Sequence, residues 1–513
     1  MSSDHAYAVK NTHTKLKHNA LNFWEVLAQA IALISPSMTA ALIVPLMFST
    51  AANAGWLCYL FGTVMLLFVA ISLNQFAKRY TSAGSMYEYT VKGLGPKIGG
   101  LSGWSLIWAY MFIGIAGTTG FTHFASILLT QAGASQDIGM KGYMGHPWIT
   151  LFAICIFSSW FLAYKDITFS TLLMLAFEGV SVAVILILAL IAVGKTGLSD
   201  SGQMHPFAGM GFKDIMNPLG LGTVVAIFSL VGFECATAFG EEAKTPLKTI
   251  PRAVIASLLL TGAFFIFITY VETHALGAAN LGSLSAPLST LSDNMGVHWM
   301  GVVICFGAMF SFFALAMSCL NAGARVLFTM GRYGVFPISI GSSHKHNLTP
   351  HVALTAFAIV QFLIPTVFML AIYAGHTTGL AMAAPLDEFN NAGTLGAMGF
   401  CGAYVLISLA TPFYLKKIGE LKWHHIATSV IALVLLVVPI VGLVWPNPLT
   451  PPMNLTPYIY GAYLLIGGII ILIRGRSSAD IESIRKVLEE TTFVATTKLP
   501  PGATESEGEP VLA

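Results

Sequence analysis

Charged residues are scarce in this chain. Of its 513 residues only 9% are Asp, Glu, Lys or Arg, whereas 56% are hydrophobic. An ordinary soluble domain carries about 25% charged residues, so the composition excludes a soluble fold. It indicates instead a protein that crosses the membrane many times and has the lipid bilayer as its surroundings.

Cysteine motifs and catalytic motifs are missing as well. The 6 cysteines all fall within apolar runs without a CxxC or His-rich pattern, so neither a disulfide framework nor a metal site is expected. Outside the apolar runs there is no nucleophile, metal or phosphate motif, so we expect neither an enzyme nor a cofactor. The net charge of +2 gives no indication of nucleic acid as a partner. The polar amino-terminal tail lacks the short apolar core of a cleaved signal peptide.

Long apolar runs are what the chain does contain. There are twelve of them, at roughly 24–48, 53–77, 98–129, 147–164, 168–194, 218–240, 253–275, 298–324, 351–373, 394–415, 423–445 and 456–473. Each has about eighteen residues or more, enough for one helical crossing. Hydrocarbon offers the backbone no water, and the alternating pattern of a barrel strand is absent, so the runs are predicted to be helices.

Lys and Arg are divided unequally between the loops. If the amino terminus is inside, 22 of the 25 lie on the cytoplasmic side, and only Lys141, Lys195 and Lys213 lie outside. Cytoplasmic loops are enriched in Lys and Arg, so this division predicts the orientation. We expect a multi-pass protein of the cell membrane with both tails, 1–23 and 474–513, in the cytoplasm.

Acidic side chains within the runs are the first candidates for function. We interpret only Glu178 and Glu234 as lying deep inside the apolar runs, and no Lys or Arg does. Ionisable groups are costly in a bilayer and usually mark a functional site, so both are candidates.

Two of the runs are interrupted. The first contains Ser35, Pro36 and Ser37, and proline removes a backbone amide and disfavours helix at the preceding residue. The sixth contains Gly232 and Glu234 where a crossing helix should be continuous and apolar. Because five spans separate their starts, the two broken helices cross in opposite directions, which is the sequence pattern of an inverted repeat. In the third run, Gly114, Gly117 and Gly120 predict close contact with another helix.

The motifs around these breaks resemble those of the amino acid, polyamine and organocation (APC) transporter superfamily. The resemblance covers roughly residues 20 to 475 and rests on Gly232–Glu234, Glu241–Lys244, Pro246, Ile250–Ala253, Ala83–Tyr89, Gly103, Trp104, Asn321–Val326 and Gly331–Pro337. It implies an all-α membrane fold of twelve helices with a LeuT-like core. Helices 1–5 (24–194) and 6–10 (218–415) would be the inverted repeats, and 423–473 two peripheral helices. One departure is Ser37–Ala40, where many relatives carry a glycine-rich run.

The broken helices together predict a site for a free amino acid. The second half of the first run would present unpaired amides near Ser37–Ala40, suited to a carboxylate. The first half of the sixth would end in free carbonyls near Leu230 and Val231, suited to an ammonium group. The predicted substrate-binding residues are Ile34, Ser35, Ser37, Met38, Thr39, Ala40, Phe228, Leu230, Val231 and Gly232.

Gating is expected from Phe228 and Glu234. In similar transporters an aromatic at the position of Phe228 closes over the substrate; the alternative is ordinary packing. Glu234 lies inside the break, where its carboxyl could bond loose amides and switch as the inner gate opens, or contact a basic substrate directly. Charges at the cytoplasmic mouth, Glu241, Glu242, Lys244 and Arg252, are either a gate network or solvated loop residues. Ser311, Ser318 and Asn321 either line the coupling site or bond neighbouring helices.

Proton coupling is predicted for Glu178. It lies about ten residues into the fifth run, or ~15 Å along the helix axis, near mid-bilayer. Some proton-driven APC transporters carry a lysine in the corresponding span, beside the place where sodium-driven LeuT-like proteins hold their ion. A glutamate differs in sign but can still bind and release a proton. The alternative is a permanently neutral carboxyl hydrogen-bonded to the first or eighth helix.

The function expected from these features is secondary transport of a small amino acid by alternating access, as a symporter that couples to a proton. Sodium is the alternative coupling ion. A polyamine or organic-cation transporter, or an amino acid exchanger, is the alternative carrier. A channel or a nontransporting sensor is the alternative from another class. Substrate identity, oligomeric state and the role of the 375–391 loop have no interpretation from the sequence.

Overall fold

The computed structural model describes residues 16–17, 19–132, 147–165, 167–199, 201–277, 281, 284, 286–373, 383–444 and 453–474. The carboxyl tail beyond Arg474 and most of the 375–391 loop's first half therefore lie outside the described residues. Within the described part the chain is helical, with one isolated bridge between Leu21 and Ala243 and no strand. The all-α prediction is confirmed for these residues.

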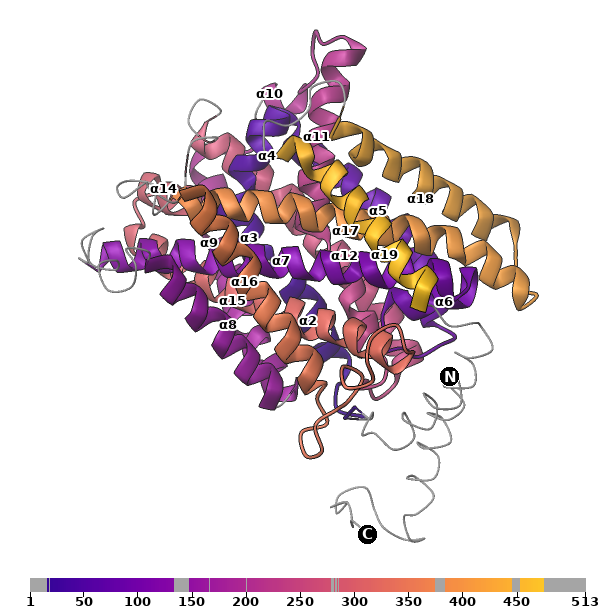
Figure 1. Ribbon diagram of the computed structural model, residues 1–513. Coiled ribbons are helices and arrows are strands. Elements are labelled where there is room, and N and C mark those ends of the chain that lie inside the picture. Colours follow the sequence, from indigo (N-terminus) through magenta and orange to yellow (C-terminus); the bar gives the residue numbers. More distant parts are fainter. Residues whose placement is uncertain are drawn as a thin grey trace, which may run out of the picture.

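The helices cross one another in a single bundle (Figure 1). Their bounds are α2 Phe23–Ile34, α3 Pro36–Met38, η1 Thr39–Ile43, α4 Val44–Ala51, η2 Ala52–Ala54, α5 Gly55–Ala77, α6 Met86–Leu94, α7 Pro96–Gln131, α8 Pro147–Lys165, α9 Ile167–Thr196, α10 Ser201–Met204, α11 Phe212–Leu230, η3 Phe233–Phe239, α12 Pro246–Leu276, α14 Pro287–Asn294, α15 His298–Arg332, α16 His351–Tyr373, α17 Ala383–Lys417, α18 Trp423–Gly442, η4 Met453–Leu455 and α19 Thr456–Arg474.

Three long helices, α7, α15 and α17, form the centre of the bundle, and α15 and α17 both pack against α7. Small residues on α7 permit the close approach. A Cβ added to Gly117 would lie 2.8 Å from the Ala316 amide nitrogen on α15, and one at Gly120 would overlap the Phe312 ring. The helix contact predicted for the glycines of the third run is therefore present. The last two helices lie at the edge, α18 against α17 and α11, and α19 against α7.

Eleven helical segments in the described residues are long and apolar enough to cross a membrane. The first of them, Phe23–Ala77, has 55 residues and combines α2 to α5. Apolar side chains cover the outside of the bundle: Leu465 and Ile473 on α19 are 71% and 77% exposed. A surface of this kind suits lipid, so the chain is a multi-pass membrane protein.

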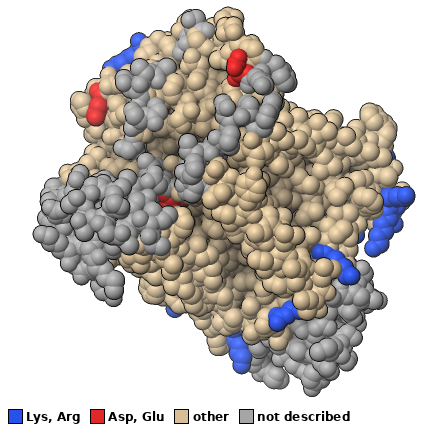
Figure 2. All heavy atoms as spheres, turned by 45° about the horizontal axis from the view of Figure 1, so that its top comes forward, with Lys and Arg blue, Asp and Glu red and all other residues tan. Residues whose placement is uncertain are grey.

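Lys and Arg gather at one end of the bundle, which we call the basic end. It includes the carboxyl ends of α5, α8, α15 and α17 and the start of α12. Arg79 after α5 pairs with Glu420 after α17 at 2.6 Å, so these two helix ends lie together. Figure 2 shows blue side chains mainly along the lower and right edges of an otherwise largely uncharged surface.

Candidate functional site

The first helix break lies between α2 and α3. Ser35 adopts the left-handed region (φ 52°, ψ 70°), and Pro36 starts α3. In a continuous helix the Ser37 amide would donate to the Leu33 carbonyl four residues earlier. Here it donates to Oε1 of Glu178 on α9, at 2.9 Å. The helix then resumes through a π-helical turn, η1, before α4.

The second break lies between α11 and η3. Val231 is extended (φ −60°, ψ 144°), and Gly232 has φ 119°, which a residue with a side chain rarely adopts. The Gly232 amide would pair with the Phe228 carbonyl in a continuous helix. It donates instead to Oε2 of Glu234, at 3.0 Å. The chain continues as the 3-10 helix η3.

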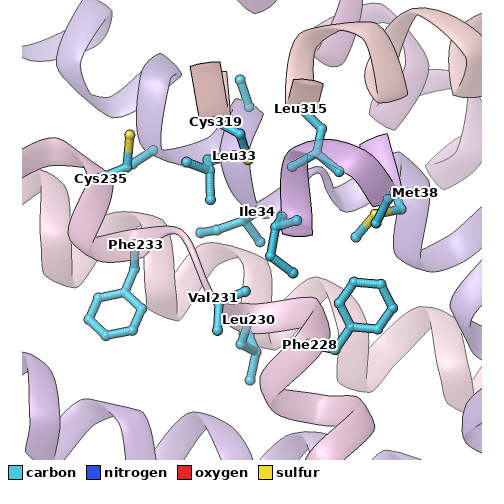
Figure 3. Close-up of a cluster of buried hydrophobic side chains, with 14 of the residues drawn as sticks. Leu33, Ile34, Met38, Phe228, Leu230, Val231, Phe233, Cys235, Leu315 and Cys319 are labelled. Carbon is cyan, nitrogen blue, oxygen red and sulfur yellow. The ribbon is translucent and has the colours of Figure 1, made fainter. Parts of the chain in front are cut away.

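The two breaks touch each other. A Cβ added to Gly232 would lie 2.5 Å from Leu33 Cδ2 and 2.9 Å from the Ile34 nitrogen. Only glycine fits this approach. Figure 3 shows Leu33, Ile34 and Met38 from the first break near Val231 and Phe228 from the second.

Glu234 is fully buried, and both of its oxygens accept hydrogen bonds. Besides the Gly232 amide, the Tyr404 hydroxyl on α17 donates to Oε2 at 2.7 Å. The Tyr110 hydroxyl on α7 is 3.5 Å from Oε1. Glu234 therefore joins the second break to two of the three central helices.

Glu178 is buried too (3% exposed), but it is less completely bonded. Its Oε1 accepts from the Ser37 amide, whereas Oε2 has no hydrogen-bond partner. The hydroxyls of Ser37 and Ser311 lie beside the carboxyl. Ser311 on α15 also shares a hydrogen bond of 2.7 Å with the Ser35 hydroxyl, so α9 and α15 meet at the first break.

The predicted substrate-binding residues lie together around the two breaks, and each is buried. One detail differs from the sequence-based expectation. The amides of Met38 and Thr39 donate to the Ser35 carbonyl, and the Ser37 amide is held by Glu178, so these three are not free. Because Ser35 is in the left-handed region, its carbonyl points to the start of the next helical segment and accepts from the Met38 and Thr39 amides, which were expected to be free.

Phe228 belongs to an aromatic cluster that also includes Phe389, Phe312 and Phe124. The ring centroids of Phe228 and Phe389 are 5.2 Å apart, those of Phe389 and Phe312 5.7 Å, and those of Phe312 and Phe124 5.6 Å. The cluster joins four helices, α11, α17, α15 and α7, beside the breaks. Sequence reasoning found only Phe228, because its three partners lie on helices far away in the chain.

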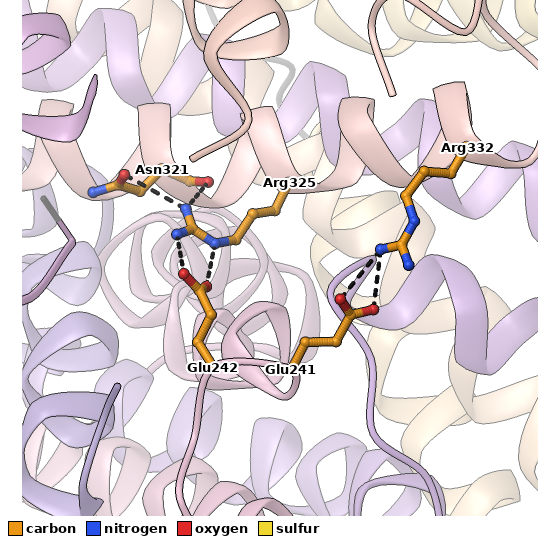
Figure 4. Close-up of polar contacts among 5 residues, drawn as sticks. All are labelled: Glu241, Glu242, Asn321, Arg325 and Arg332. Atoms are coloured by element: carbon orange, nitrogen blue, oxygen red, sulfur yellow. Dashed lines mark hydrogen bonds and ion pairs between the residues drawn. The ribbon is translucent and has the colours of Figure 1, made fainter. Parts of the chain in front are cut away.

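At the basic end the site is closed by ion pairs (Figure 4). Arg325 on α15 donates to both oxygens of Glu242, at 2.7 and 3.0 Å, and both side chains are 1% exposed. Arg332 donates to both oxygens of Glu241, at 3.1 and 3.2 Å. Lys244 and Arg252 are exposed. The mouth charges thus divide into two paired acids and two solvated bases.

Two further contacts hold this end. The amides of Ala20 and Leu21, before α2, donate to the Glu242 carbonyl at 2.8 and 3.0 Å. Glu88 on α6 accepts a hydrogen bond of 2.6 Å from the Tyr333 hydroxyl. Burial and then the nearby charge of Glu241 raise the pKa of Glu88 above its usual value. The segment before the first break and the segment after the second are therefore held together at the basic end.

Two of the buried charges that the sequence interpretation missed are Glu272 and Arg325. Glu272 on α12 lies within the seventh apolar run and is 0% exposed, so it joins Glu178 and Glu234 as a buried acid of the apolar runs. Arg325 lies inside the end of α15, not in a loop, because the helix continues to Arg332. For Glu272 the signal was present and was overlooked near the end of the run. For Arg325 the buried partner Glu242 is 83 residues away and could not be found from spacing.

Among the described residues, no group of three or more His, Cys, Asp and Glu side chains could hold a metal ion. What the arrangement offers is two helix ends facing each other, backbone carbonyls released by the breaks, and two carboxyls that hold backbone amides. Such groups bind and orient a small polar molecule by hydrogen bonds and partial charges.

Comparison with known proteins identifies the family of the chain. The profile of the family described as amino acid permease matches residues 25–486. Similar curated proteins include the branched-chain amino acid permease BcaP of Bacillus subtilis (strain 168), 25% identical over 72% of this chain and 76% of its own. The low-affinity putrescine importer PlaP of Escherichia coli (strain K12) is 27% identical over 70% of this chain and 73% of its own. Cationic amino acid transporter 4 of Mus musculus is 23% identical over 70% of this chain and 54% of its own. The chain therefore belongs to the amino acid permease family.

Proposed function

We propose that this permease is a secondary transporter that moves a small amino acid by alternating access, coupled to a proton. The observation that carries the proposal is the pair of touching helix breaks. At each, one backbone amide has left its helical partner for a buried carboxyl. The carbonyls of Phe228 and Leu33 thereby lose the donors that a continuous helix would supply.

The substrate ammonium group is assigned to the carboxyl end of α11. The carbonyls of Phe228, Ser229 and Leu230 end this helix, where the macrodipole favours a cation. The substrate carboxylate is assigned to the Ser37 amide at the start of the next segment of the first helix. This amide now holds Glu178, so the substrate carboxylate and Glu178 compete for one donor.

That competition supplies the coupling to a proton. An ionised carboxylate is a stronger acceptor than a neutral carboxyl. When Glu178 takes up a proton, its hold on the Ser37 amide weakens, and the substrate carboxylate can replace it. Release of the substrate returns the amide to Glu178 as the proton leaves. Proton and substrate therefore bind together and leave together, as symport requires.

Glu234 is assigned to the structure and gating of the second break. It holds the Gly232 amide away from α11, and it connects the break to Tyr404 and Tyr110. The ion pairs Glu242–Arg325 and Glu241–Arg332 form the inner gate, and the aromatic cluster around Phe228 forms the outer gate. Opening one gate while the other stays closed gives alternating access.

The proposal includes the orientation of the chain in the membrane and the number of its crossings. The basic end faces the cytoplasm of a cell membrane, because cytoplasmic loops carry the Lys and Arg excess. The 55-residue segment Phe23–Ala77 counts as two crossings, since about 20 residues span the hydrocarbon and Ala52 interrupts the helix with φ 46°. Twelve crossings result. The breaks in the first and sixth support two inverted repeats of the LeuT type.

Uptake by the purified protein in liposomes tests the proposal. A labelled branched-chain amino acid, lysine and putrescine are offered with an inward proton gradient, a sodium gradient, or neither. We expect an amino acid to accumulate with the proton gradient alone, and unlabelled substrate inside to accelerate its entry. Equal accumulation of putrescine, a molecule without a carboxylate, would favour the polyamine carrier. A requirement for sodium would contradict proton coupling, and the absence of countertransport would contradict a carrier.

A further inference from the structure

Another buried carboxyl, that of Glu272, lies outside the site described above. It is 0% exposed and one turn from the end of α12, the end away from the basic end. Neither of its oxygens has a hydrogen-bond partner. The hydroxyl of Thr269, three residues earlier and on the same face of α12, also has no partner. Buried polar groups almost always have partners, so two on one helix face call for an explanation.

The surroundings of Glu272 are apolar or already paired. On α5, which packs along α12, Tyr59 is close enough for an electrostatic interaction, but its hydroxyl shares a hydrogen bond of 2.8 Å with Ser229. On the other elements that pack on α12, the described acids and Lys195 have partners of their own, including Asp214 on α11 with the Gly211 amide. The others are Glu25 with the Asn22 amide, Glu178 with the Ser37 amide, Glu234 with the Gly232 amide, Asp293 with His298, and Lys195 with the Met295 carbonyl.

We propose that Glu272 is a second proton-binding site of this permease, loaded from the end of the bundle opposite the basic end. A bare carboxylate without a partner would be very unfavourable in this position, so Glu272 holds a proton in the closed arrangement seen here. This inference rests on the proposed proton-coupled transport and adds a second carboxyl to it.

The number of oxygen atoms decides between a proton and a metal cation. Glu272 and Thr269 together present three oxygens without partners. Hard metal cations take about six to eight oxygen ligands, whereas a proton needs one. A purely structural role is the other alternative. A side chain that makes no bond could be replaced by an apolar residue without loss of stability, so bonding does not explain a carboxyl here.

The position of Glu272 gives it a route to water and a connection to the substrate. Four residues, or about 6 Å along the axis, separate it from the end of α12 at Leu276. The short helix α14 packs on α12 and also on η1 of the first broken helix. A movement of η1 and α14 would therefore expose Glu272. Through Tyr59 and Ser229 its charge acts on the last turn of α11, which ends at the second break.

Infrared difference spectroscopy on the full chain in liposomes tests the protonation itself. A protonated carboxyl has its own C=O band, and the spectrum is recorded as the external pH is raised. We expect Glu272→Gln to remove a band that titrates in the wild type, and Glu178→Gln to remove a different one. If Glu272→Gln leaves the titrating bands unchanged, the proposal is wrong.

Stoichiometry and stability complete the test. The number of protons per substrate is measured from reversal potentials in the same liposomes, and we expect Glu272→Gln to lower it by one. Transport with an unchanged ratio would overturn the second site and leave the proposed function intact. Absence of transport in the wild type, with the Glu272 band present, would overturn the proposed function alone.

Two further outcomes are decisive. We expect Glu272→Leu to melt at the same temperature as the wild type or higher, because no hydrogen bond is lost. A clear fall in melting temperature in both Glu272→Leu and Glu272→Gln would mean that the carboxyl is part of the packing and would overturn the proposal. Sodium that stabilises the wild type but not Glu272→Gln would identify a metal cation as the ligand in place of the proton.

Discussion

A buried glutamate holds each of the two helix breaks, but its hydrogen bonding is complete at the second break and incomplete at the first. Each diverts one backbone amide from its helix to a buried glutamate. At the second break Glu234 lies two residues from the amide, and both of its oxygens are bonded. At the first break Glu178 reaches in from α9, and one oxygen has no partner. The second break is thus fixed by its own segment, whereas the first depends on a contact that can change.

Both breaks are attached to α15, the first by a weaker contact than the second; we call these two contacts the anchors of the breaks. The first break is joined to α15 by the hydrogen bond between Ser35 and Ser311. The segment after the second break is joined to it by the buried ion pair of Glu242 and Arg325. The first break is therefore the one we expect to rearrange when a proton or substrate binds.

Removing the stronger anchor, the ion pair of Glu242 and Arg325, gives the largest expected effect on stability. Arg325→Met leaves the Glu242 carboxylate buried without its partner, which costs about 3–5 kcal/mol. Thermal unfolding in detergent measures the loss. The double variant Arg325→Met, Glu242→Leu should recover most of it, and Arg252→Met, at an exposed arginine, should change little. A small effect of Arg325→Met would mean that the second break is not anchored through α15.

Replacing each glutamate by leucine compares the breaks directly. Glu234→Leu leaves the Gly232 amide and the Tyr404 hydroxyl without an acceptor, whereas Glu178→Leu leaves only the Ser37 amide. At about 1–3 kcal/mol for each unsatisfied buried group, we expect roughly twice the loss of stability for Glu234→Leu. Equal losses in the two unfolding curves would remove the distinction between a fixed and a changeable break.

The glycine of the second break can be tested in the same assay. In Gly232→Ala the new Cβ meets Leu33 and Ile34, and the backbone stays at φ 119°. Overpacking and the unfavourable φ together cost about 3 kcal/mol. Gly461→Ala on α19, where no atom lies within 4 Å of the new Cβ, is the matched control and should be at least as stable as wild type, because alanine is the better helix former. If the two variants unfold alike, the breaks do not need their close contact.

The weaker anchor gives the smallest effect on stability. Ser311→Ala removes the hydrogen bond to Ser35 and should lower the free energy of unfolding by about 1 kcal/mol. Because the first break is the changeable one, the same variant should alter substrate affinity more than it alters stability. Binding measured by thermal shift against substrate concentration, beside Thr355→Ala as a control away from the breaks, separates the two effects.

Local backbone chemistry explains what could be predicted from the sequence. Pro36 cannot donate, and Gly232 accepts a positive φ, so the helices are interrupted at the residues where we expected it. The partners of the breaks could not be predicted, because they come from distant segments: Ser37 and Glu178 are 141 residues apart, and Glu234 and Tyr404 170. The amides near Ser37 were expected to be free for the same reason, since nothing local indicates that α9 delivers a carboxyl there.

Concentrative uptake by Glu178→Gln tests the central claim most directly. The purified variant in liposomes is given an inward proton gradient and labelled substrate, and exchange of internal for external substrate is measured alongside. Glutamine still offers an oxygen to the Ser37 amide but cannot carry the proton. We expect exchange to persist and proton-driven accumulation to disappear. Accumulation at the wild-type level would contradict the assignment of Glu178 as the coupling site.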